Sequence, residues 1–489
     1  MAEPTRPSGG PAGPRLGPLL VVVALVVAAG ALAALPARAT DLARTTADEP
    51  QYLLSAISLA EDRDLDISDE LREERWRDFH EVELPRQTEP RADGSELSPH
   101  DPLLPLLLAV PVAIGGWWGA KVALALLAGL LAAVTTWVAV RRFAVRPAVA
   151  AGTVIAFGLA PPLTAYGTQL YPELPAALAT TIAVGAVTGR LGRRGRIVLG
   201  LAVVALPWLA VKYAPVAAAL VVVALIRLLS RGDRRAAVVL VGALGVAGVV
   251  FLALHQVIYG GWTVYAAGDH FVGGEFTVVG SSPDYVGRSL RLVGLLLDRG
   301  FGLIAWAPVF LLTVAALAAL VRVRPPGWAA LVVPAAAGWA NATWVALTMH
   351  GWWWPGRQVV VIVPLLVLAT AWWVDRHPPV RPALAVAAVA GFVLWGWLVV
   401  EVLQHRLTLV VDFEATRDPL ARAWRTLLPD YRRPGTRTWA LQALWLVILA
   451  LVARAGWRSG RGDEDAGAGE RADADVVAVD LDRGGAVRR

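Results

Sequence analysis

Long apolar stretches alternate with short polar ones along most of this chain. An α-helix needs about 20 apolar residues to cross the hydrocarbon core of a bilayer, and twelve stretches approach or reach that length. They lie near residues 19–37, 119–140, 148–165, 172–189, 197–211, 214–229, 236–258, 301–321, 327–348, 358–374, 382–400 and 439–455. The pattern predicts an all-α fold, a polytopic transmembrane helix bundle of about 12 spans.

Arginine clusters occupy every second connection between these stretches. The clusters are Arg141, Arg142 and Arg146; Arg190, Arg193, Arg194 and Arg196; Arg227, Arg231, Arg234 and Arg235; Arg322 and Arg324; Arg376 and Arg381; and Arg454, Arg458 and Arg461. Positively charged loops stay in the cytoplasm. Twelve crossings then place both termini in the cytoplasm and residues 38–118, 259–300, 349–357 and 401–438 outside. We expect a multi-pass protein of the plasma membrane.

Composition agrees with a membrane-embedded body. The chain of 489 residues is 56% hydrophobic and 17% charged, with a mean hydropathy of +0.56. Cysteine is absent, which excludes disulfides and thiolate nucleophiles. All lysines and arginines except Lys121 and Lys212 are arginine. With the abundance of Ala, Val and Gly, this bias is typical of GC-rich coding sequences, so the high pI does not indicate a nucleic-acid partner.

The two ends of the chain differ from its body. Residues 1–18 and 459–489 are rich in Gly, Ala, Pro or charged residues, which predicts disordered cytoplasmic tails around a transmembrane domain at 19–458. Ala37-Arg38-Ala39 after the first apolar run resembles a signal-peptidase site. We favour an uncleaved anchor, because the chemistry of the following loop needs tethering at both ends.

Residues 103–116 are apolar but too short and too rich in Pro and Gly for a full span. Counting them as a span would move the arginines at 141–146 outside. We therefore expect an interfacial helix within the first extracytoplasmic loop, lying along the outer membrane surface.

The first outer loop is strongly acidic. Residues 39–100 hold 17 Asp and Glu against 7 Arg. Apolar spacing after Pro50 predicts a helix that holds Asp48 and Glu49 at its N-terminus. One of these carboxylates could act as a general base that takes a proton from an incoming hydroxyl. The alternative is that Asp48 only caps the helix.

A second acidic pattern follows in the same loop. Asp62, Asp64 and Asp66, with Glu73 eleven residues after Asp62, have the spacing of a calcium-binding loop. Ile67 stands where such a loop needs Gly for its sharp turn, so a divalent cation here is the minority interpretation.

Three ionisable residues fall at the outer ends of predicted spans: Glu173, Lys212 and Arg357. Charge at membrane depth is costly unless it faces a cavity or a partner, so each is a candidate site residue. Lys212 and Arg357 have the chemistry to bind a phosphate. Snorkelling to the interface is the alternative. Trp352–Trp354 beside Arg357 fit an interfacial belt or a platform for a sugar.

Several short motifs together resemble the C-type membrane glycosyltransferases, which include the protein O-mannosyltransferase and aminoarabinose transferase group. They are Asp48-Glu49-Pro50-Gln51-Tyr52-Leu53, Asp64-Leu65-Asp66-Ile67, Ser98-Pro99-His100-Asp101-Pro102-Leu103-Leu104-Pro105, Tyr171-Pro172-Glu173-Leu174-Pro175, Pro207-Trp208 with Lys212-Tyr213, Asp298-Arg299-Gly300-Phe301-Gly302 with Ala307-Pro308, and Trp352-Trp353-Trp354-Pro355-Gly356-Arg357. Their ordered succession across residues 15–375 carries the resemblance. Leu103 departs from it, because Gly is more frequent there in that group.

The resemblance implies an inverting hexosyl- or pentosyltransferase that uses a polyprenyl-phosphate sugar donor at the extracytoplasmic face. Asp48 and Glu49 would be catalytic, with Asp48 as the base. Glu173, His100 and Tyr52 would line the site for a glycan, lipid or protein acceptor, and Lys212, Arg357 and Arg299 would bind the donor phosphate. No cofactor is required by this chemistry, and no Gly-rich nucleotide loop is present. Membrane lipids are the remaining expected partner.

The outer segment 401–438 is basic, with seven Arg against five acids. We expect a short helix near 415–428. It would cover the donor phosphate, meet an anionic acceptor, or contact lipid headgroups.

A secondary transporter or a flippase for lipid-linked sugars is the rival function. Transporters place buried charge at the middle of the membrane and repeat their halves. Here the ionisable candidates lie at the outer ends of the spans, and no repeat of fixed period is visible.

Overall fold

The computed structural model describes residues 16–267 and 283–484, with side chains described as far as Gly460. Within this part of the chain every regular element is a helix, and the only β-bridge pairs Asp66 with Leu97. Each of the twelve predicted spans overlaps one of the longer helices. These helices are α1 (Leu16–Leu32), α4 (Leu103–Arg142), α5 (Pro147–Gly158), α7 (Glu173–Thr188), α8 (Arg193–Leu209), α9 (Ala214–Ser230), α10 (Arg234–Tyr259), α14 (Leu311–Val323), α15 (Ala329–Ala340), α16 (Val363–Arg376), α17 (Arg381–Leu403) and α19 (Thr436–Gly484).

Shorter helices occupy the connections. They are α2 (Glu49–Glu61), α3 (Ser68–Arg72), η1 (Arg75–Asp78), α6 (Leu163–Tyr166), η2 (Val211–Tyr213), η3 (Val264–Ala267), α11 (Tyr285–Ser289), α12 (Arg291–Leu297), α13 (Leu303–Trp306), η5 (Pro308–Phe310), η6 (Asn341–Val345), η7 (Arg357–Ile362), η8 (Pro378–Val380), η9 (Phe413–Ala415) and α18 (Pro419–Thr426). The predicted helix after Pro50 is α2. The helix expected near 415–428 is the shorter α18.

In the described residues, six helical segments are long and apolar enough to cross a membrane, and five further apolar helices are shorter. The protein is therefore a polytopic helical membrane protein, as the apolar pattern predicted. The number of spans stays a prediction, because a short helix completes a crossing only with the turns that flank it.

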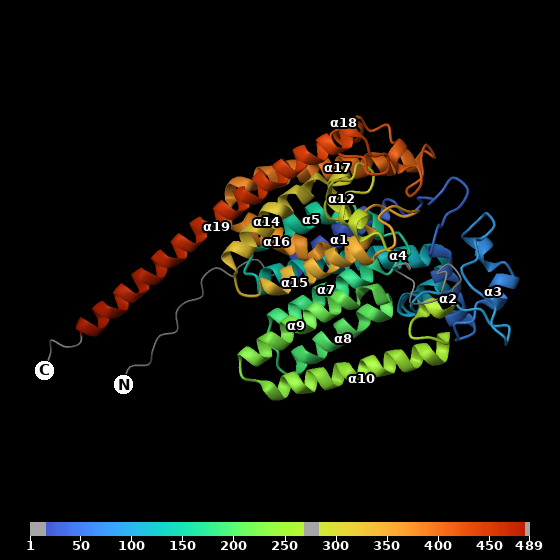
Figure 1. The fold of residues 1–489 in the computed structure, drawn as a ribbon, viewed down its shortest axis with the longest axis horizontal. Coiled ribbons are helices and arrows are strands. Elements are labelled where there is room, and N and C mark those ends of the chain that lie inside the picture. The colour runs from blue at the N-terminus through green and yellow to red at the C-terminus, as the bar shows by residue number, and fades with distance from the viewer. Residues whose placement is uncertain (1–15, 268–282, 485–489) are drawn as a thin grey trace.

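The long helices run side by side along the long axis of the molecule, and α2 and α3 lie at the end opposite both termini (Figure 1). The bundle is close-packed where small residues face each other. A Cβ on Gly129 of α4 would lie 2.5 Å from the Ala24 carbonyl oxygen of α1. Small residues let helix backbones approach in this way inside membranes. The first apolar stretch is thus an integral helix of the bundle.

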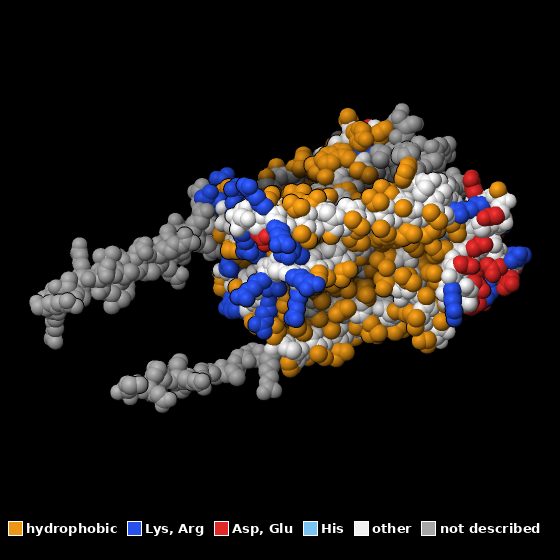
Figure 2. Space-filling model, turned by 90° about the horizontal axis from the view of Figure 1, so that it is seen from below, with side chains coloured by type: hydrophobic (Ala, Val, Ile, Leu, Met, Phe, Trp, Pro, Cys, Tyr) orange, Lys and Arg blue, Asp and Glu red, His pale blue; other side chains and the backbone are white. Residues whose placement is uncertain are grey.

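Charge separates the two ends of the molecule. Figure 2 shows Lys and Arg side chains gathered at one end, Asp and Glu at the other, and an apolar band between them. At the basic end, Arg146 of the α4–α5 connection pairs with Asp375 of α16 at 2.6 Å. The arginine clusters that the sequence assigned to one side of the membrane therefore do lie together in space.

Helix α4 contains both the expected interfacial helix and the following span. A kink separates the two arms: Gly116 has φ 54° and ψ −139°, a conformation that strongly favours glycine. The first arm exposes large apolar side chains, at Leu106, Leu107, Val110 and Ile114. The second arm folds closely onto the first, since a Cβ on Gly119 would overlap the Pro111 carbonyl oxygen.

Helix α19 continues through much of the expected C-terminal tail, to Gly484. Residues 1–15 and 485–489 of the expected tails lie outside the described residues, and the division of the chain into 1–18, 19–458 and 459–489 stays a prediction.

Candidate active site

A cavity of about 270 Å³ lies at the end of the bundle that carries the acidic loop. Its wall comes from five separate parts of the chain: the start of α2, the segment before α4, η2, η3 and the stretch from η6 to η7. The lining residues are Asp48, Tyr52, Pro99, His100, Asp101, Ala210, Lys212, Val264, Tyr265, Asn341, Val345, Ala346, Leu347, Thr348, Trp353, Arg357 and Gln358.

Four predicted site residues form one ionic cluster, of which Asp48, Lys212 and Arg357 line this cavity and Glu173 lies behind them. Arg357 Nη2 lies 2.5 Å from Asp48 Oδ2, and Arg357 Nε lies 3.0 Å from Glu173 Oε1. Lys212 Nζ contacts the same Glu173 oxygen at 2.7 Å. Two carboxylates and two cations therefore meet, although 309 positions separate Asp48 from Arg357 in the sequence.

Local backbone structure places Asp48 and Arg357 of this cluster. Asp48 is the N-cap residue of α2, yet its side chain makes no capping hydrogen bond and turns to Arg357 instead. The interpretation of Asp48 as a simple helix cap is therefore wrong. Gly356, at φ 87°, makes the left-handed turn from which η7 begins with Arg357.

Aromatic rings hold the guanidinium of Arg357 in place. Its Cζ lies 4.1 Å from the ring centre of Tyr171 and 4.8 Å from that of Trp353. The faces of the aromatic rings attract the positively charged guanidinium, which keeps it at this position. Of the neighbouring tryptophans, Trp352 is exposed and Trp354 is fully buried. The three tryptophans thus occupy different environments rather than forming one belt.

The electrostatic state of Asp48 follows from its neighbours. Burial by itself would raise the pKa of this carboxyl, but Arg357, together with His100 and Lys212, outweighs burial and holds the pKa well below its ordinary value. Asp48 is therefore a carboxylate at neutral pH. While it is paired with Arg357 it is also a weak base.

Glu49 lies behind the cavity wall. Its two carboxylate oxygens accept backbone hydrogen bonds from Leu170 at 2.9 Å and Thr46 at 3.1 Å. Burial raises the pKa of this carboxyl. Glu49 ties the start of α2 to the segment before α7, and the structure brings it to the site as a support rather than as part of the lining.

Tyr52 and His100 line the cavity beside Asp48. Their ring centres are 4.7 Å apart, and His100 Nε2 lies 3.0 Å from Gln87 Oε1. Burial raises the pKa of the Tyr52 hydroxyl well above its ordinary value, so it stays protonated. Glu173 differs from this pair: it is fully buried and is not part of the lining, and its Oε1 contacts both Lys212 and Arg357.

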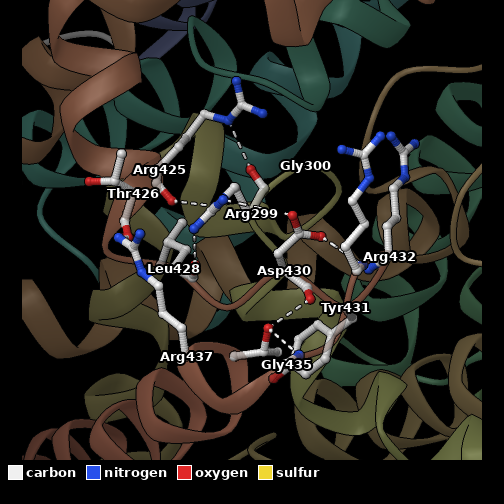
Figure 3. A network of polar contacts seen from close by, with 12 residues as sticks. Arg299, Gly300, Arg425, Thr426, Leu428, Asp430, Tyr431, Arg432, Gly435 and Arg437 are labelled. Atoms are coloured by element: carbon white, nitrogen blue, oxygen red, sulfur yellow. Dashed lines mark hydrogen bonds and ion pairs between the residues drawn. The ribbon is translucent and has the colours of Figure 1, made fainter.

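Arg299, which the resemblance assigned to the donor phosphate, belongs to a different place (Figure 3). Its Nε donates to the Arg425 carbonyl at 3.1 Å, and its Nη1 lies 3.7 Å from Asp430 Oδ2. Arg299 is not part of the cavity lining. The structure therefore places Arg299 against the outer basic segment, which it fastens to the loop before α13.

Asp101 and His255 were not singled out from the sequence. Asp101 lines the cavity; its Oδ2 accepts the Val211 N–H at 3.1 Å, and its Oδ1 lies 3.4 Å from His255 Nε2. His255 is fully buried on α10, with Nδ1 2.8 Å from the Phe251 carbonyl. Because that carbonyl can only accept, the Asp101–His255 contact needs a proton shared by the pair.

Asn341 also escaped the sequence analysis. Its Nδ2 donates to the Lys212 carbonyl at 3.1 Å, and it begins the π-helical turn η6. Such turns are frequent at functional sites, but no sequence pattern announces them. The only sequence signal for Asp101 was its position next to His100 in the quoted motif.

The arrangement of the helices is similar to that of a solved C-type membrane glycosyltransferase. Two solved structures of the aminoarabinose transferase ArnT from Cupriavidus metallidurans share this fold. The structure bound to undecaprenyl phosphate has a TM-score of 0.51, covers 92% of this chain and 79% of its own, and is 16% identical. The apo structure has a TM-score of 0.50, with 91% and 77% covered and 16% identity. The resemblance drawn from the sequence is confirmed for the fold.

No protein-family model matches the sequence, and no curated protein sequence matches it. At 16% identity the likeness to ArnT concerns the fold. The chemistry has to be argued from the residues of the cavity.

Proposed function

We propose that this protein is an integral-membrane glycosyltransferase that transfers a sugar from a polyprenyl-phosphate donor to a hydroxyl acceptor, with inversion. One observation carries the proposal: Asp48, Lys212 and Arg357 share the wall of one cavity at the end of the bundle where the arginine clusters are absent. Such a transfer needs a base beside the acceptor hydroxyl and cations beside the departing phosphate. The site would face the outside of the plasma membrane, with both termini in the cytoplasm.

Lys212 and Arg357 would bind the donor phosphate. Both cations contact Glu173 Oε1, so they are held close together before any ligand arrives. Negative charge grows on the phosphate as the sugar leaves, and cations placed in advance stabilise that charge. The neighbouring wall at Val345 and Leu347 is apolar and partly exposed, which suits a donor whose lipid chain stays in the bilayer.

Asp48 would accept the proton of the acceptor hydroxyl. The acceptor oxygen attacks the anomeric carbon, the bond from that carbon to the phosphate oxygen breaks, and the phosphate departs with the electron pair. In the resting protein Arg357 keeps Asp48 a weak base. A donor phosphate that draws Arg357 toward itself would raise the basicity of Asp48, so the base would gain strength only when the donor is bound.

The remaining residues have supporting parts in this proposal. Glu49 positions the start of α2, and Glu173 keeps the two cations together. Tyr52 and His100 line the side from which a glycan, lipid or protein acceptor would approach Asp48. Asp101, by accepting the Val211 N–H, fixes the backbone next to Lys212. No cofactor takes part in the proposed transfer.

Binding of the lipid product is the first test. Purified protein in detergent is mixed with undecaprenyl phosphate, and the bound lipid is measured by native mass spectrometry. We expect binding by the unaltered protein and weak binding by Lys212→Gln. Equal binding by both proteins would remove the phosphate site. Arg433→Gln, an exposed arginine of the outer basic segment, is the control.

Turnover is the second test. The protein is reconstituted with a panel of undecaprenyl-phosphate-linked pentoses and hexoses and a membrane extract as the source of acceptors. We expect release of undecaprenyl phosphate, and its loss in Asp48→Asn protein that is still folded. Full turnover by Asp48→Asn would remove the proposed base. Movement of the intact donor across the vesicle membrane, without release of undecaprenyl phosphate, would favour the transporter instead.

A further inference from the structure

Three carboxylates of the first outer loop converge at the end of α2 that lies away from the cavity. Asp62 is the C-cap residue of α2, and Asp69 and Glu70 lie in the first turn of α3. One oxygen from each of the three lies within 4.8 Å of the others. Two oxygens bound to one Ca²⁺ at about 2.4 Å are at most about 4.8 Å apart. The spacing therefore suits a single ion between the two helices.

The charge of these carboxylates is only partly compensated, because Arg75 acts on Asp62 and Glu70 from a distance without pairing with either. Within the described part of the chain, none of the three carboxylates takes part in an ion pair. The nearby Arg75 is bound through two nitrogens to Glu61, at 2.8 and 2.9 Å. The arginine that could have neutralised the cluster is thus already paired with a different carboxylate. Three like charges so close together repel one another unless a cation or protons separate them.

Glu70 provides an independent observation. The residue is only 3% exposed, and its Oε2 is buried without a hydrogen-bond partner. Buried carboxylate oxygens are costly when nothing satisfies them, and such an atom calls for a ligand. An oxygen of this same carboxylate lies in the cluster with Asp62 and Asp69, so the unsatisfied carboxylate belongs to the acidic site.

The ligand set differs from the calcium loop that the sequence suggested. Asp64 Oδ1 accepts from Ser58 Oγ at 2.8 Å, and Asp66 Oδ1 accepts from the backbone of Ser68 at 3.0 Å and of Glu96 at 2.9 Å. Asp64 and Asp66 shape the turn and do not join the cluster. Ile67, in place of the usual Gly, is fully buried here. The calcium-loop pattern and this cluster therefore lie in the same loop and share Asp62, but differ in their other members.

We propose that Asp62, Asp69 and Glu70 bind one divalent cation of the calcium class, with water completing its coordination. Carboxylate oxygens without nitrogen or sulfur select hard cations. The ion fastens the C-terminal end of α2 to α3. The proposal does not depend on the glycosyltransferase reaction, although α2 also carries Asp48 at its other end.

Calcium binding to the full-length protein in detergent tests this. Protein treated with chelator is titrated with Ca²⁺ in a calorimeter, and its thermal unfolding is followed with and without Ca²⁺. We expect one site with a Kd on the order of 0.1–1 mM, as in extracellular calcium modules, and a higher Tm with Ca²⁺. In Glu70→Gln we expect an affinity lower by about 10- to 100-fold or more, since even supporting residues of metal sites cost that much.

The control is Glu89→Gln, an exposed carboxylate of the same loop, which should bind Ca²⁺ as the unaltered protein does. Glu70→Gln could alter stability by itself, so Asp69→Asn serves as a second variant, and the decisive quantity is the Ca²⁺-dependent part of the Tm. Equal Ca²⁺ binding by the unaltered protein and both variants would overturn the proposal. Absence of calcium binding to the unaltered protein would do so as well.

Discussion

Two arginines that the sequence placed in the same role, Arg357 and Arg299, have opposite surroundings. Arg357 lines a cavity together with Asp48, and directs its nitrogens to the side chains of Asp48 and of the buried Glu173. Arg299 directs its nitrogens chiefly to backbone carbonyls of residues 425 and 428, and Arg425 returns a bond to the Arg299 carbonyl at 2.9 Å (Figure 3). One arginine faces partners that a ligand can replace. The other holds a loop together.

The same contrast extends to the two regions. In the outer basic segment, Glu414 pairs with Arg425 and Arg432, so part of the positive charge that the sequence suggested for substrate is spent on folding. In the cavity, the carboxylates and cations come from distant segments and meet only at the site. The difference teaches that the partners of a charged residue indicate its role better than its sign or its place in a loop. Five experiments test this contrast between the cavity cluster and the surroundings of Arg299.

Replacement of Asp48 should have the largest effect. In Asp48→Asn the side chain keeps its size but no longer accepts a proton, so we expect kcat to fall by about 10²- to 10⁴-fold. Release of undecaprenyl phosphate measures it. Asp93→Asn, on the exposed surface of the same loop, should keep full activity. A normal kcat in Asp48→Asn would show that the cavity cluster is as structural as the one around Arg299.

Replacement of Glu173 should mainly reduce stability. Glu173→Gln leaves Lys212 and Arg357 near one another without their shared, fully buried carboxylate. Removing one partner of a buried ion pair costs about 3–5 kcal/mol, and we expect the lower end because the Lys212 side chain is 23% exposed. Thermal unfolding in detergent measures the change. An unchanged Tm would mean that solvent or lipid already screens the two cations.

Loss of a cation in the cavity should weaken lipid binding. A hydrogen bond to a charged group contributes about 1.5–3 kcal/mol, which corresponds to roughly a 10- to 150-fold weaker affinity of Lys212→Gln for undecaprenyl phosphate. Titration of the lipid into purified protein provides the number. The prediction fails if Arg433→Gln weakens binding by the same factor, because the effect would then be one of overall charge.

The acid side of the pH profile should report the Asp48–Arg357 pair. In the unaltered protein the lowered pKa keeps Asp48 charged as the pH falls. The value of kcat/KM should therefore fall through protonation of Asp48 only in strong acid. Arg357→Gln removes the largest stabilising charge, and burial then raises the pKa. The activity that remains in Arg357→Gln should decline at a higher pH than that of the unaltered protein. If the unaltered protein and Arg357→Gln lose activity at the same acidic pH, Asp48 is excluded as the titrating base.

Replacement of Arg299 should have the smallest effect. Arg299→Gln leaves carbonyls of the outer basic segment without donors, which costs about 1–3 kcal/mol of stability. Its affinity for undecaprenyl phosphate should equal that of the unaltered protein. Both quantities come from the unfolding and titration experiments above. A large loss of affinity would restore Arg299 as a phosphate ligand and end the contrast with Arg357.

Much of the architecture could be predicted from the sequence, because bilayer thickness and backbone hydrogen bonding restrict a spanning chain to long apolar helices. The twelve helical stretches, the gathering of arginines at one end and the helix after Pro50 all follow from local composition. For the site, Asp48, Glu173, Lys212 and Arg357 were selected from separate stretches of the sequence and assigned to one site by the resemblance, and the structure shows the ion pairs that join them.

The chain's local composition therefore fixed the membrane-embedded helical body, its charge asymmetry and most of the chemical groups available at the end that carries the acidic loop. Tertiary structure alone decided which groups meet: it set Glu49 and Arg299 on backbone partners, and added Asp101, His255 and Asn341 to the site. The physical reason is the distance along the chain over which each kind of interaction acts. Hydropathy and helix preference act over neighbouring residues, whereas an ion pair depends on the positions of side chains hundreds of residues apart, which only the packing of the bundle specifies.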